Sequence, residues 1–141
     1  MAAAVCYRRS GEEIEFLLVR TKTSKRWTFP KGHVRSAEAA WAAAAREARE
    51  EAGVEGEVER TPFIHYLYPD TRDDDEERVS WVAAFLLAVR STDAAEEPAR
   101  RPRWFTAEDA VTKLVAKRET LFAVEHVNVI RAALESLAGR R

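Results

Sequence analysis

The amino-acid sequence predicts an α/β protein in which a mixed β-sheet lies between helices. Short strand-like runs alternate along the chain with segments of helical periodicity, which is typical of this fold class. The 141 residues are enough for one domain with its own core, and 46% of them are hydrophobic. No repeat and no low-complexity linker divides the chain. We therefore expect a single domain over residues 1–141.

The first half of the chain contains most of the predicted strands. Residues 2–7 and 13–19 are apolar runs separated by Ser10-Gly11, a pattern that predicts a hairpin. Residues 27–29 form a short extended segment before Pro30. After a predicted helix, residues 57–60 and 63–68 are again expected to be extended.

The second half begins with a charged segment, residues 69–78, which has no apolar residue to anchor it. Residues 79–89 are the longest apolar run and predict the central strand of the sheet. Trp104-Phe105 predicts a short further strand. Trp27 and Trp81 lie beside apolar strands, so both are expected in the core.

Two helices are predicted at the C-terminal end. Thr106, with Asp109 three residues later, predicts a capped helix through about Ala116. Residues 119–137 predict a closing helix whose apolar face contains Leu121, Phe122, Val124, Val127, Ile130, Leu134 and Leu137.

The segment between Ser36 and Gly53 predicts another helix. Ser36 is the expected N-cap, and Glu38 is expected in the first turn, where the helix dipole favours an acid. Residues 39–45 are rich in alanine, the residue with the highest helix propensity. Gly53 is placed to end the helix in the left-handed conformation. Before the helix, Gly32 allows a loop to pass close to a ligand.

Three glutamates share one face of this predicted helix. Glu47, Glu50 and Glu51 are spaced i, i+3 and i+4, and like charges at this spacing repel by roughly 0.2–0.5 kcal/mol per pair. A divalent metal would compensate this repulsion, and carboxylate oxygens suit Mg²⁺ or Mn²⁺. Arg46 is within reach of Glu50 and, more distantly, Glu38, so we expect it to fix carboxylates in place.

The spacing of these residues resembles the Nudix box over residues 32–54. Every defined position is present in the pattern Gly32-x5-Glu38-x7-Arg46-Glu47-Ala48-x-Glu50-Glu51-x-Gly53-Val54. The resemblance implies a Nudix hydrolase with an α/β/α sandwich fold, a divalent metal ion, and attack on a phosphoanhydride bond. The alternative is a solvated, alanine-rich helix, and the register of both glycines with Glu38 argues against it.

The same resemblance implies roles for individual residues. Water is the nucleophile, and Glu47, Glu50 and Glu51 are metal ligands, directly or through water, with the carbonyl of Lys31 as a further ligand. Arg46 joins the catalytic set in a structural role. The general base is Glu47, Glu50 or a glutamate outside the box, and the outside candidates are Glu97 or Glu96, followed by Glu76 and Glu77.

The segment from Trp27 to Val34 resembles that of diadenosine polyphosphate hydrolases and also that of diphosphoinositol polyphosphate phosphohydrolases. Lys31 and His33 would place positive charge and a hydrogen-bond donor along a phosphate chain. Tyr66 and Tyr68 share one face of a strand, where they are candidates to stack on a base. Packing in the core is the alternative for both tyrosines.

The sequence thus predicts a metal-dependent pyrophosphohydrolase of diadenosine polyphosphates or related nucleoside polyphosphates. Alternatives within the enzyme class are hydrolysis of diphosphoinositol polyphosphates, of oxidised nucleoside triphosphates, or of RNA 5′ ends. The RNA alternative is disfavoured because no pronounced basic stripe is present. A Nudix module that senses nucleotides without turnover is an alternative of a different class, and the intact box glutamates argue against it.

Composition restricts the partners and the location. The formal net charge of −1 gives no general attraction to nucleic acid or to an anionic membrane. We expect a nucleotide-like small-molecule substrate, no stable nucleic-acid binding, and a monomer or homodimer. Cys6 is the single cysteine and is expected in a buried strand. Residues 1–5 are too short for a signal sequence or a membrane span, so a cytoplasmic location is expected.

Overall fold

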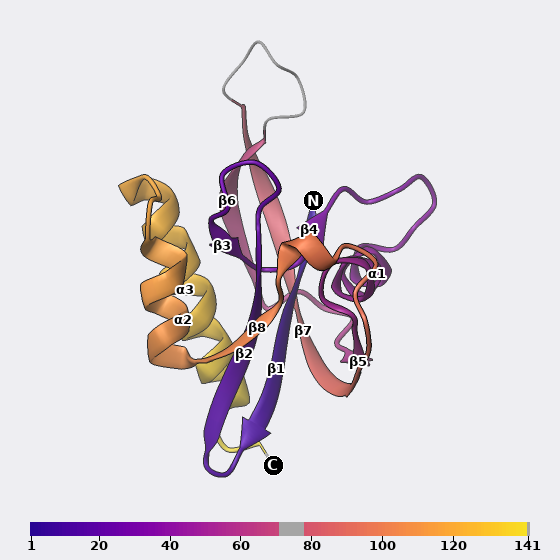
Figure 1. The fold of residues 1–141 in the computed structure, drawn as a ribbon, viewed down its shortest axis with the longest axis vertical. Coiled ribbons are helices and arrows are strands. Elements are labelled where there is room, and N and C mark those ends of the chain that lie inside the picture. The colour runs from indigo at the N-terminus through magenta and orange to yellow at the C-terminus, as the bar shows by residue number, and fades with distance from the viewer. Residues whose placement is uncertain (71–77, 141) are drawn as a thin grey trace.

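The computed structural model describes residues 1–70 and 78–140 and has three layers (Figure 1). A mixed sheet forms the middle layer. Helix α1 (Ala40–Ala52) covers one face, and α2 (Ala107–Val115) and α3 (Thr120–Leu137) cover the other. The predicted α/β/α architecture is confirmed.

Within the described residues, the sheet has eight strands in the order β3-β2-β1-β7-β5, with β4 on β1, β6 on β7 and β8 on β2. Among the strand pairs of the described residues, only β1–β7 is parallel. The strands are β1 (Ala2–Ser10), β2 (Glu13–Arg20), β3 (Trp27–Thr28), β4 (Lys31–Gly32), β5 (Val54–Val58), β6 (Ile64–Asp70), β7 (Arg78–Thr92) and β8 (Arg103–Thr106).

Strand β7 is the central strand that the longest apolar run predicts. It pairs with β1 on one side and with both β6 and β5 on the other. Its side chains alternate between two cores, as the period of a strand requires. Val82, Ala84 and Leu86 pack in the core that includes residues of α2 and α3, whereas Phe85 and Leu87 pack in the core that includes residues of α1.

Strands β1 and β2 pair with each other at one end and separate towards the other, so they form a fork beside the box residues 32–54. They pair at the hairpin end, from Tyr7 opposite Phe16 to Ser10 opposite Glu13. Towards the other end β4 pairs with β1, and β3 pairs with β2. Residues 27–32 therefore fill the fork, and Pro30 C=O accepts a hydrogen bond from Ala4 N–H at 2.9 Å. This places Lys31 and Gly32 against α1.

Helix α1 begins later than predicted. Its N-cap is Ala39, and the predicted capping by Ser36 is wrong. Ala37 adopts a left-handed φ of 63°, and Glu38 N–H donates to Arg35 C=O at 3.1 Å, so residues 35–38 turn tightly before the helix. Glu38 consequently lies outside the first helical turn.

The other predicted helix ends are confirmed. Gly53 caps α1 with φ 66°, and its N–H donates to Arg49 C=O at 3.0 Å. The hydroxyl of Thr106 accepts a hydrogen bond from Asp109 N–H at 3.2 Å. None of the helices in the described residues is long and apolar enough to cross a membrane.

Two core predictions are wrong in part. Trp27 is buried, but Trp81 is 61% exposed because the core that includes α1 reaches Ala83 and stops there. On α3, Leu121 and Val124 are more than half exposed. The buried stripe of α3 instead consists of Phe122, His126, Val129, Ile130, Ala133 and Leu137.

Candidate active site

Arg46 ties the loop before α1 to the helix. Its guanidinium donates to both carboxylate oxygens of Glu38, at 2.9 and 3.0 Å, and to His33 C=O at 3.1 Å. It also donates to Glu47 Oε1 at 2.8 Å and Glu50 Oε2 at 3.4 Å. These bonds, together with the N–H of Arg35, lower the pKa of Glu38 to about 2. Arg46 thus fixes three carboxylates at once.

Gly32 allows the loop to touch the carboxylate of Glu47. A Cβ on Gly32 would lie 2.1 Å from Glu47 Oε1, so a larger residue would push the carboxylate of Glu47 out of its position. Burial raises the pKa of Glu47, and the neighbouring Arg46 opposes this shift. The charges of Glu50 and Glu97 raise it further. Glu47 is therefore surrounded by carboxylates from two parts of the chain.

Glu51 is the most deeply buried carboxylate of the box, with 2% of its surface exposed. Its Oε2 accepts a hydrogen bond from Lys31 N–H at 3.0 Å, and its Oε1 lies 3.1 Å from Arg100 Nη2. Burial raises the pKa of Glu51 to about 7, and Arg100 and Lys31 pull it down. An additional positive charge would stabilise the ionised form.

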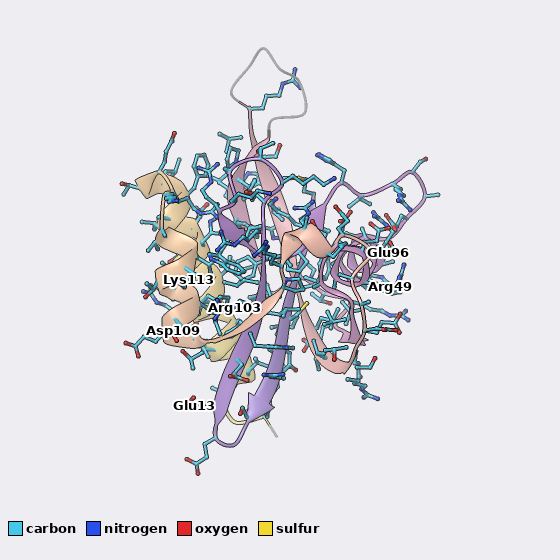
Figure 2. All side chains as sticks on the ribbon, viewed as in Figure 1. Glu13, Arg49, Glu96, Arg103, Asp109 and Lys113 are labelled. Carbon is cyan, nitrogen blue, oxygen red and sulfur yellow. The ribbon has the colours of Figure 1, made fainter. Side chains whose placement is uncertain are left out.

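Glu97 reaches the site from the segment before β8. Its N–H donates to Glu50 C=O at 3.1 Å, which holds it at the C-terminal end of α1. Its carboxylate lies 3.3 Å from Arg100 Nε and 3.3 Å from Lys22 Nζ. Glu96 instead is exposed and lies beside Arg49 on the surface (Figure 2). Glu76 and Glu77 lie outside the described residues.

Arg100 is a site residue that the sequence analysis missed. It bridges Glu51 and Glu97, and its Nη1 donates to Arg20 C=O at 3.3 Å. The 3-10 turn η1 (Pro98–Arg100) follows Glu97 and brings Arg100 back to it at i+3. The spacing Glu97-x2-Arg100 was the available signal for that pair. The contact with Glu51 depends on the tertiary fold.

Lys31 and Tyr68 lie together on the side of the sheet that faces α3. Lys31 Nζ is 3.9 Å from the centroid of the Tyr68 ring, and Arg118 Cζ is 5.8 Å from the same centroid. Burial raises the pKa of Tyr68, but Lys31 and Arg118 together outweigh it and bring the pKa below its usual value. Arg118, between α2 and α3, is the second residue that the sequence analysis missed.

Tyr66 does not lie at a cleft rim. Its side chain is fully buried, and its ring packs edge-on against Phe29 and His126 at 6.1 and 5.3 Å. The ring therefore presents no exposed face to a base. His33 lies on the loop beside the box, where its carbonyl is held by Arg46.

The donor set fits a hard divalent ion in its chemistry, although its oxygens are bound to arginines. Across residues 1–70 and 78–140, no three His, Cys, Asp or Glu side chains converge on one point. Arg46 binds Glu47 and Glu50, and Arg100 binds Glu51. The buried carboxylates of Glu47 and Glu51, both with raised pKa, are the groups that a cation would stabilise.

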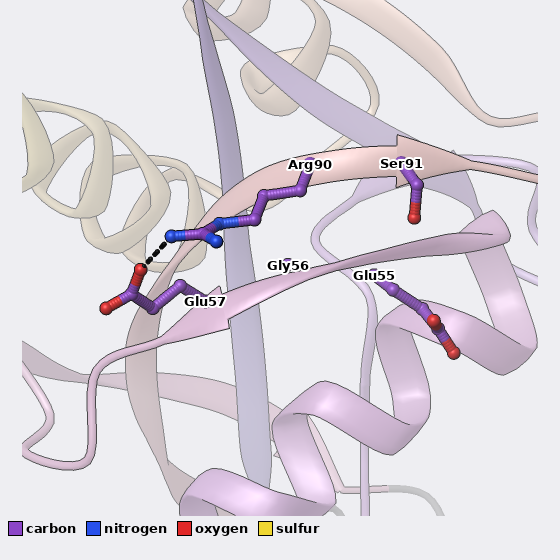
Figure 3. Close-up of a pocket in the computed structure, with 5 residues that line it drawn as sticks. All are labelled: Glu55, Gly56, Glu57, Arg90 and Ser91. Carbon is purple, nitrogen blue, oxygen red and sulfur yellow. Dashed lines mark hydrogen bonds and ion pairs between the residues drawn. The ribbon is translucent and has the colours of Figure 1, made fainter.

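A separate surface hollow of about 450 Å³ lies over the paired strands β5 and β7 (Figure 3). Its lining contains an ion pair between Arg90 and Glu57, both of which are about 70% exposed. A Cβ on Gly56 would lie 1.9 Å from Ala88 C=O, where β5 is irregular. An exposed pair of this kind contributes little and carries no reaction chemistry. The candidate active site is therefore the group of glutamates on α1, together with the loop at Lys31 and Gly32 that packs against this helix.

Comparison with known sequences and structures agrees with this geometry. The NUDIX domain matches residues 1–124. Diphosphoinositol polyphosphate phosphohydrolase 3-alpha of Homo sapiens is 27% identical over 113 residues, which are 80% of this chain and 67% of that protein. This chain thus spans about two thirds of the human protein.

One curated sequence and one solved structure from Caenorhabditis elegans are also similar. Asymmetrical bis(5′-nucleosyl)-tetraphosphatase is 46% identical over 54 residues, which are 38% of this chain and 39% of that protein. The crystal structure of an Ap4A hydrolase binary complex superimposes with a TM-score of 0.77 and 26% identity. That superposition covers 98% of this chain and 96% of the other.

Proposed function

Because the chain belongs to the NUDIX domain family, we propose that it is a metal-dependent hydrolase of phosphoanhydride bonds. One observation carries the proposal: the buried box carboxylates Glu47 and Glu51 are held by Arg46 and Arg100 respectively, and Arg100 also binds Glu97. A bound cation would stabilise the ionised form of a buried carboxylate whose pKa is raised, such as Glu51. The same cation would neutralise the negative charge of a polyphosphate substrate.

Glu47, Glu50 and Glu51 would hold the metal ion, with the carbonyl of Lys31 as a further ligand. The ion would neutralise the phosphate chain and lower the pKa of a bound water molecule. Arg46 keeps Glu47 and Glu50 oriented, and its bonds to Glu38 anchor that orientation to the loop. The chain thereby presents its carboxylates in fixed positions before substrate binds.

Water is the proposed nucleophile, and Glu97 is the proposed general base. Glu97 lies outside the box helix, so it is free of the bonds that Arg46 makes with Glu47 and Glu50. Its contacts with Arg100 and Lys22 fix its position and leave it partly exposed. Glu47 and Glu50 are the alternative bases.

The proposed substrates are diadenosine polyphosphates. Similarity to the C. elegans tetraphosphatase sequence and to the C. elegans Ap4A hydrolase structure supports this choice, and Lys31, His33 and Tyr68 are the proposed substrate-binding residues. Diphosphoinositol polyphosphates are the second candidate, because the match to the human phosphohydrolase extends over 80% of the chain. Both substrates combine an anhydride with further phosphate groups.

The variant Glu51→Gln tests the proposed metal chemistry. We expect it to abolish Mg²⁺- or Mn²⁺-dependent hydrolysis of diadenosine tetraphosphate, since a neutral amide is a poor ligand for a hard cation. Circular dichroism should show an unchanged fold. Leu134→Ala, a substitution of a partly exposed residue on α3, serves as the control and should retain activity. An active Glu51→Gln enzyme would contradict the assigned ligand role.

A further inference from the structure

Arg100 makes three contacts through the three nitrogens of its guanidinium. Nη2 lies 3.1 Å from Glu51 Oε1, Nε lies 3.3 Å from Glu97 Oε1, and Nη1 donates to Arg20 C=O at 3.3 Å. The last two contacts tie Arg100 to its near neighbour in the chain and to the end of β2, independently of α1. If the contact with Glu51 were lost, the other two would still hold the side chain in place.

Glu51 has a single counter-ion among the residues that the structure describes. Its side chain is 3% exposed, and the one ion pair that it forms there is with Arg100. Its other oxygen accepts a hydrogen bond from the neutral backbone N–H of Lys31 at 3.0 Å. A buried charge without a partner is strongly destabilising, so Arg100 is the group that makes an ionised Glu51 tolerable inside the fold.

The turn that carries Arg100 has a strained shape. Pro98 is at the first position of η1, and Arg101 closes the turn with a left-handed φ of 48°. A non-glycine residue in this conformation is unfavourable and persists only where the surrounding contacts impose it. The strained residue directly follows Arg100, whose own side chain is only 15% exposed. The turn therefore directs the guanidinium towards the glutamates of α1, against which η1 packs.

Glu51 is also a proposed metal ligand, so Arg100 and a divalent ion need the same carboxylate. The backbone N–H of Lys31 is bonded to Oε2, and Arg100 lies at Oε1. An ion bound to Oε1 would lie beside the guanidinium, and two positive groups repel each other strongly where little solvent screens them. Carboxylate oxygens are preferred ligands of Mg²⁺ and Mn²⁺, so such an ion can take the place of the guanidinium.

We propose that Glu51 exchanges Arg100 for the divalent ion, while Arg100 stays bound to Glu97 and to Arg20 C=O. Before the exchange, Arg100 neutralises the buried carboxylate and keeps it in position. Because the exchange breaks the pair of Arg100 with Glu51, the site binds the ion less tightly than its glutamates alone would. This inference rests on the proposed hydrolase function and names the residue that regulates metal loading at the same site.

Binding of Mn²⁺ tests the exchange without any turnover. Protein that has been treated with a chelator and dialysed is titrated with Mn²⁺, and the free ion is measured by electron paramagnetic resonance. We expect Arg100→Gln to bind Mn²⁺ about tenfold more tightly than the wild type, because the ion no longer displaces a guanidinium. A purely structural role for Arg100 predicts the opposite, since loosened glutamates would bind the ion more weakly.

Arg101→Gln is the matched control. It removes the same charge from the next residue, which is exposed and forms no ion pair within the described part of the chain. Its affinity for Mn²⁺ should equal that of the wild type. Thermal unfolding adds a second readout: with a chelator present, Arg100→Gln should have the lower Tm, and added Mn²⁺ should raise its Tm by more, because tighter binding stabilises the folded state further.

The outcomes separate this inference from the proposed function. Tighter Mn²⁺ binding by Arg100→Gln, with unchanged binding by Arg101→Gln, supports the exchange even if no substrate is hydrolysed. Equal or weaker binding by Arg100→Gln, or equal tightening in both variants, would overturn it, and hydrolysis by the wild type with Mn²⁺ would still uphold the proposed function. If Arg100→Gln does not fold, Arg100→Lys decides, because lysine lacks the planar fork that reaches all three partners. Tighter Mn²⁺ binding by Arg100→Lys supports the exchange, and unchanged or weaker binding overturns it.

Discussion

At the scale of single residues, three glutamates of the same loop and helix have three different environments. Glu38 is held by Arg46 and has a pKa of about 2. Burial raises the pKa of Glu47, and burial raises that of Glu51 to about 7. One carboxylate is thus a permanent structural anion, and the other two gain most from a nearby cation.

Glu97→Gln tests the proposed base. We expect kcat to fall by about 100-fold or more, because a general base contributes this much to proton transfer. KM should change little, since Glu97 contacts Arg100 and Lys22 and is assigned no substrate contact. Steady-state kinetics with Mg²⁺ would measure both. Glu96→Gln, a change at the exposed neighbouring position, is the control. Normal kcat in Glu97→Gln would move the role to Glu47 or Glu50.

His126 makes stability depend on pH. Its pKa is about 3 in the folded protein, chiefly because of burial. The unfolded chain, with an ordinary histidine pKa near 6.5, takes up the proton first, so this contribution to stability is present above about pH 6.5 and is lost as the pH falls. Between pH 6 and 4, we expect the free energy of unfolding to fall by about 1.4 kcal/mol per pH unit relative to His126→Phe.

Urea unfolding at several pH values measures this difference. His126→Phe keeps a ring against Phe29 and removes the titrating group. His65→Phe, at an exposed position on β6, is the control and should follow the wild type. Parallel pH profiles for wild type and His126→Phe would show that the buried imidazole is not the source of acid sensitivity.

At the scale of elements, the segment from Asp93 to Arg100 is built onto the C-terminal end of α1. Asp93 N–H donates to Gly53 C=O at 2.7 Å, and Glu97 N–H donates to Glu50 C=O at 3.1 Å. These bonds satisfy carbonyls that the end of a helix leaves free. The same contacts bring Glu97 and Arg100 to the box.

Gly53→Ala should disturb this docking. Gly53 has φ 66°, and a Cβ there would lie 2.1 Å from Asp93 C=O. A left-handed non-glycine residue alone costs of order 1–3 kcal/mol, and the clash adds to it. Gly11→Ala is the matched control, because Gly11 has φ 64° and open space around its Cα. Thermal unfolding should show a larger loss of Tm for Gly53→Ala, and equal losses would contradict the docking.

Local patterns in the sequence predicted most elements and missed features set by packing. The hairpin, the capped helix after Thr106 and the glycine end of α1 depend on neighbouring residues, and all three are present. The buried face of α3 was misjudged because His126, a polar residue, lies fully buried among aromatic rings. Ser36 was wrongly predicted as the N-cap of α1, because Arg46 binds Glu38 in the turn before the helix.

The residues of the candidate site were likewise predicted where they depend on local spacing and missed where they depend on tertiary contacts. The box glutamates and Arg46 lie on one helix, so their spacing alone placed them together. Glu97 was named from its position before Trp104, and the fold brings it to the box. The contact of Arg100 with Glu51 and the contact of Arg118 with Trp27 could not be found from spacing. Both contacts form only because distant segments meet at the fork.

At the scale of the whole molecule, the fork between β1 and β2 brings both helical layers to one place. On one side α1 presents Glu47 and Glu51 to the loop at Gly32. On the other side, Arg118 between α2 and α3 reaches β3 and Tyr68 (Figure 1). Lys31 belongs to both sides, since its N–H donates to Glu51 and its Nζ lies over the Tyr68 ring.

We propose that this site hydrolyses a phosphoanhydride bond with the help of a bound metal ion. The most direct measurement is a product-identification assay with Mg²⁺ and Mn²⁺, alone and with a chelator. Its substrates are diadenosine polyphosphates, nucleoside triphosphates including oxidised ones, ADP-ribose, diphosphoinositol polyphosphates and 5′-triphosphate RNA. We predict metal-dependent cleavage of diadenosine tetraphosphate with ATP among the products. Metal-dependent binding with no turnover of any of these substrates would contradict the claim.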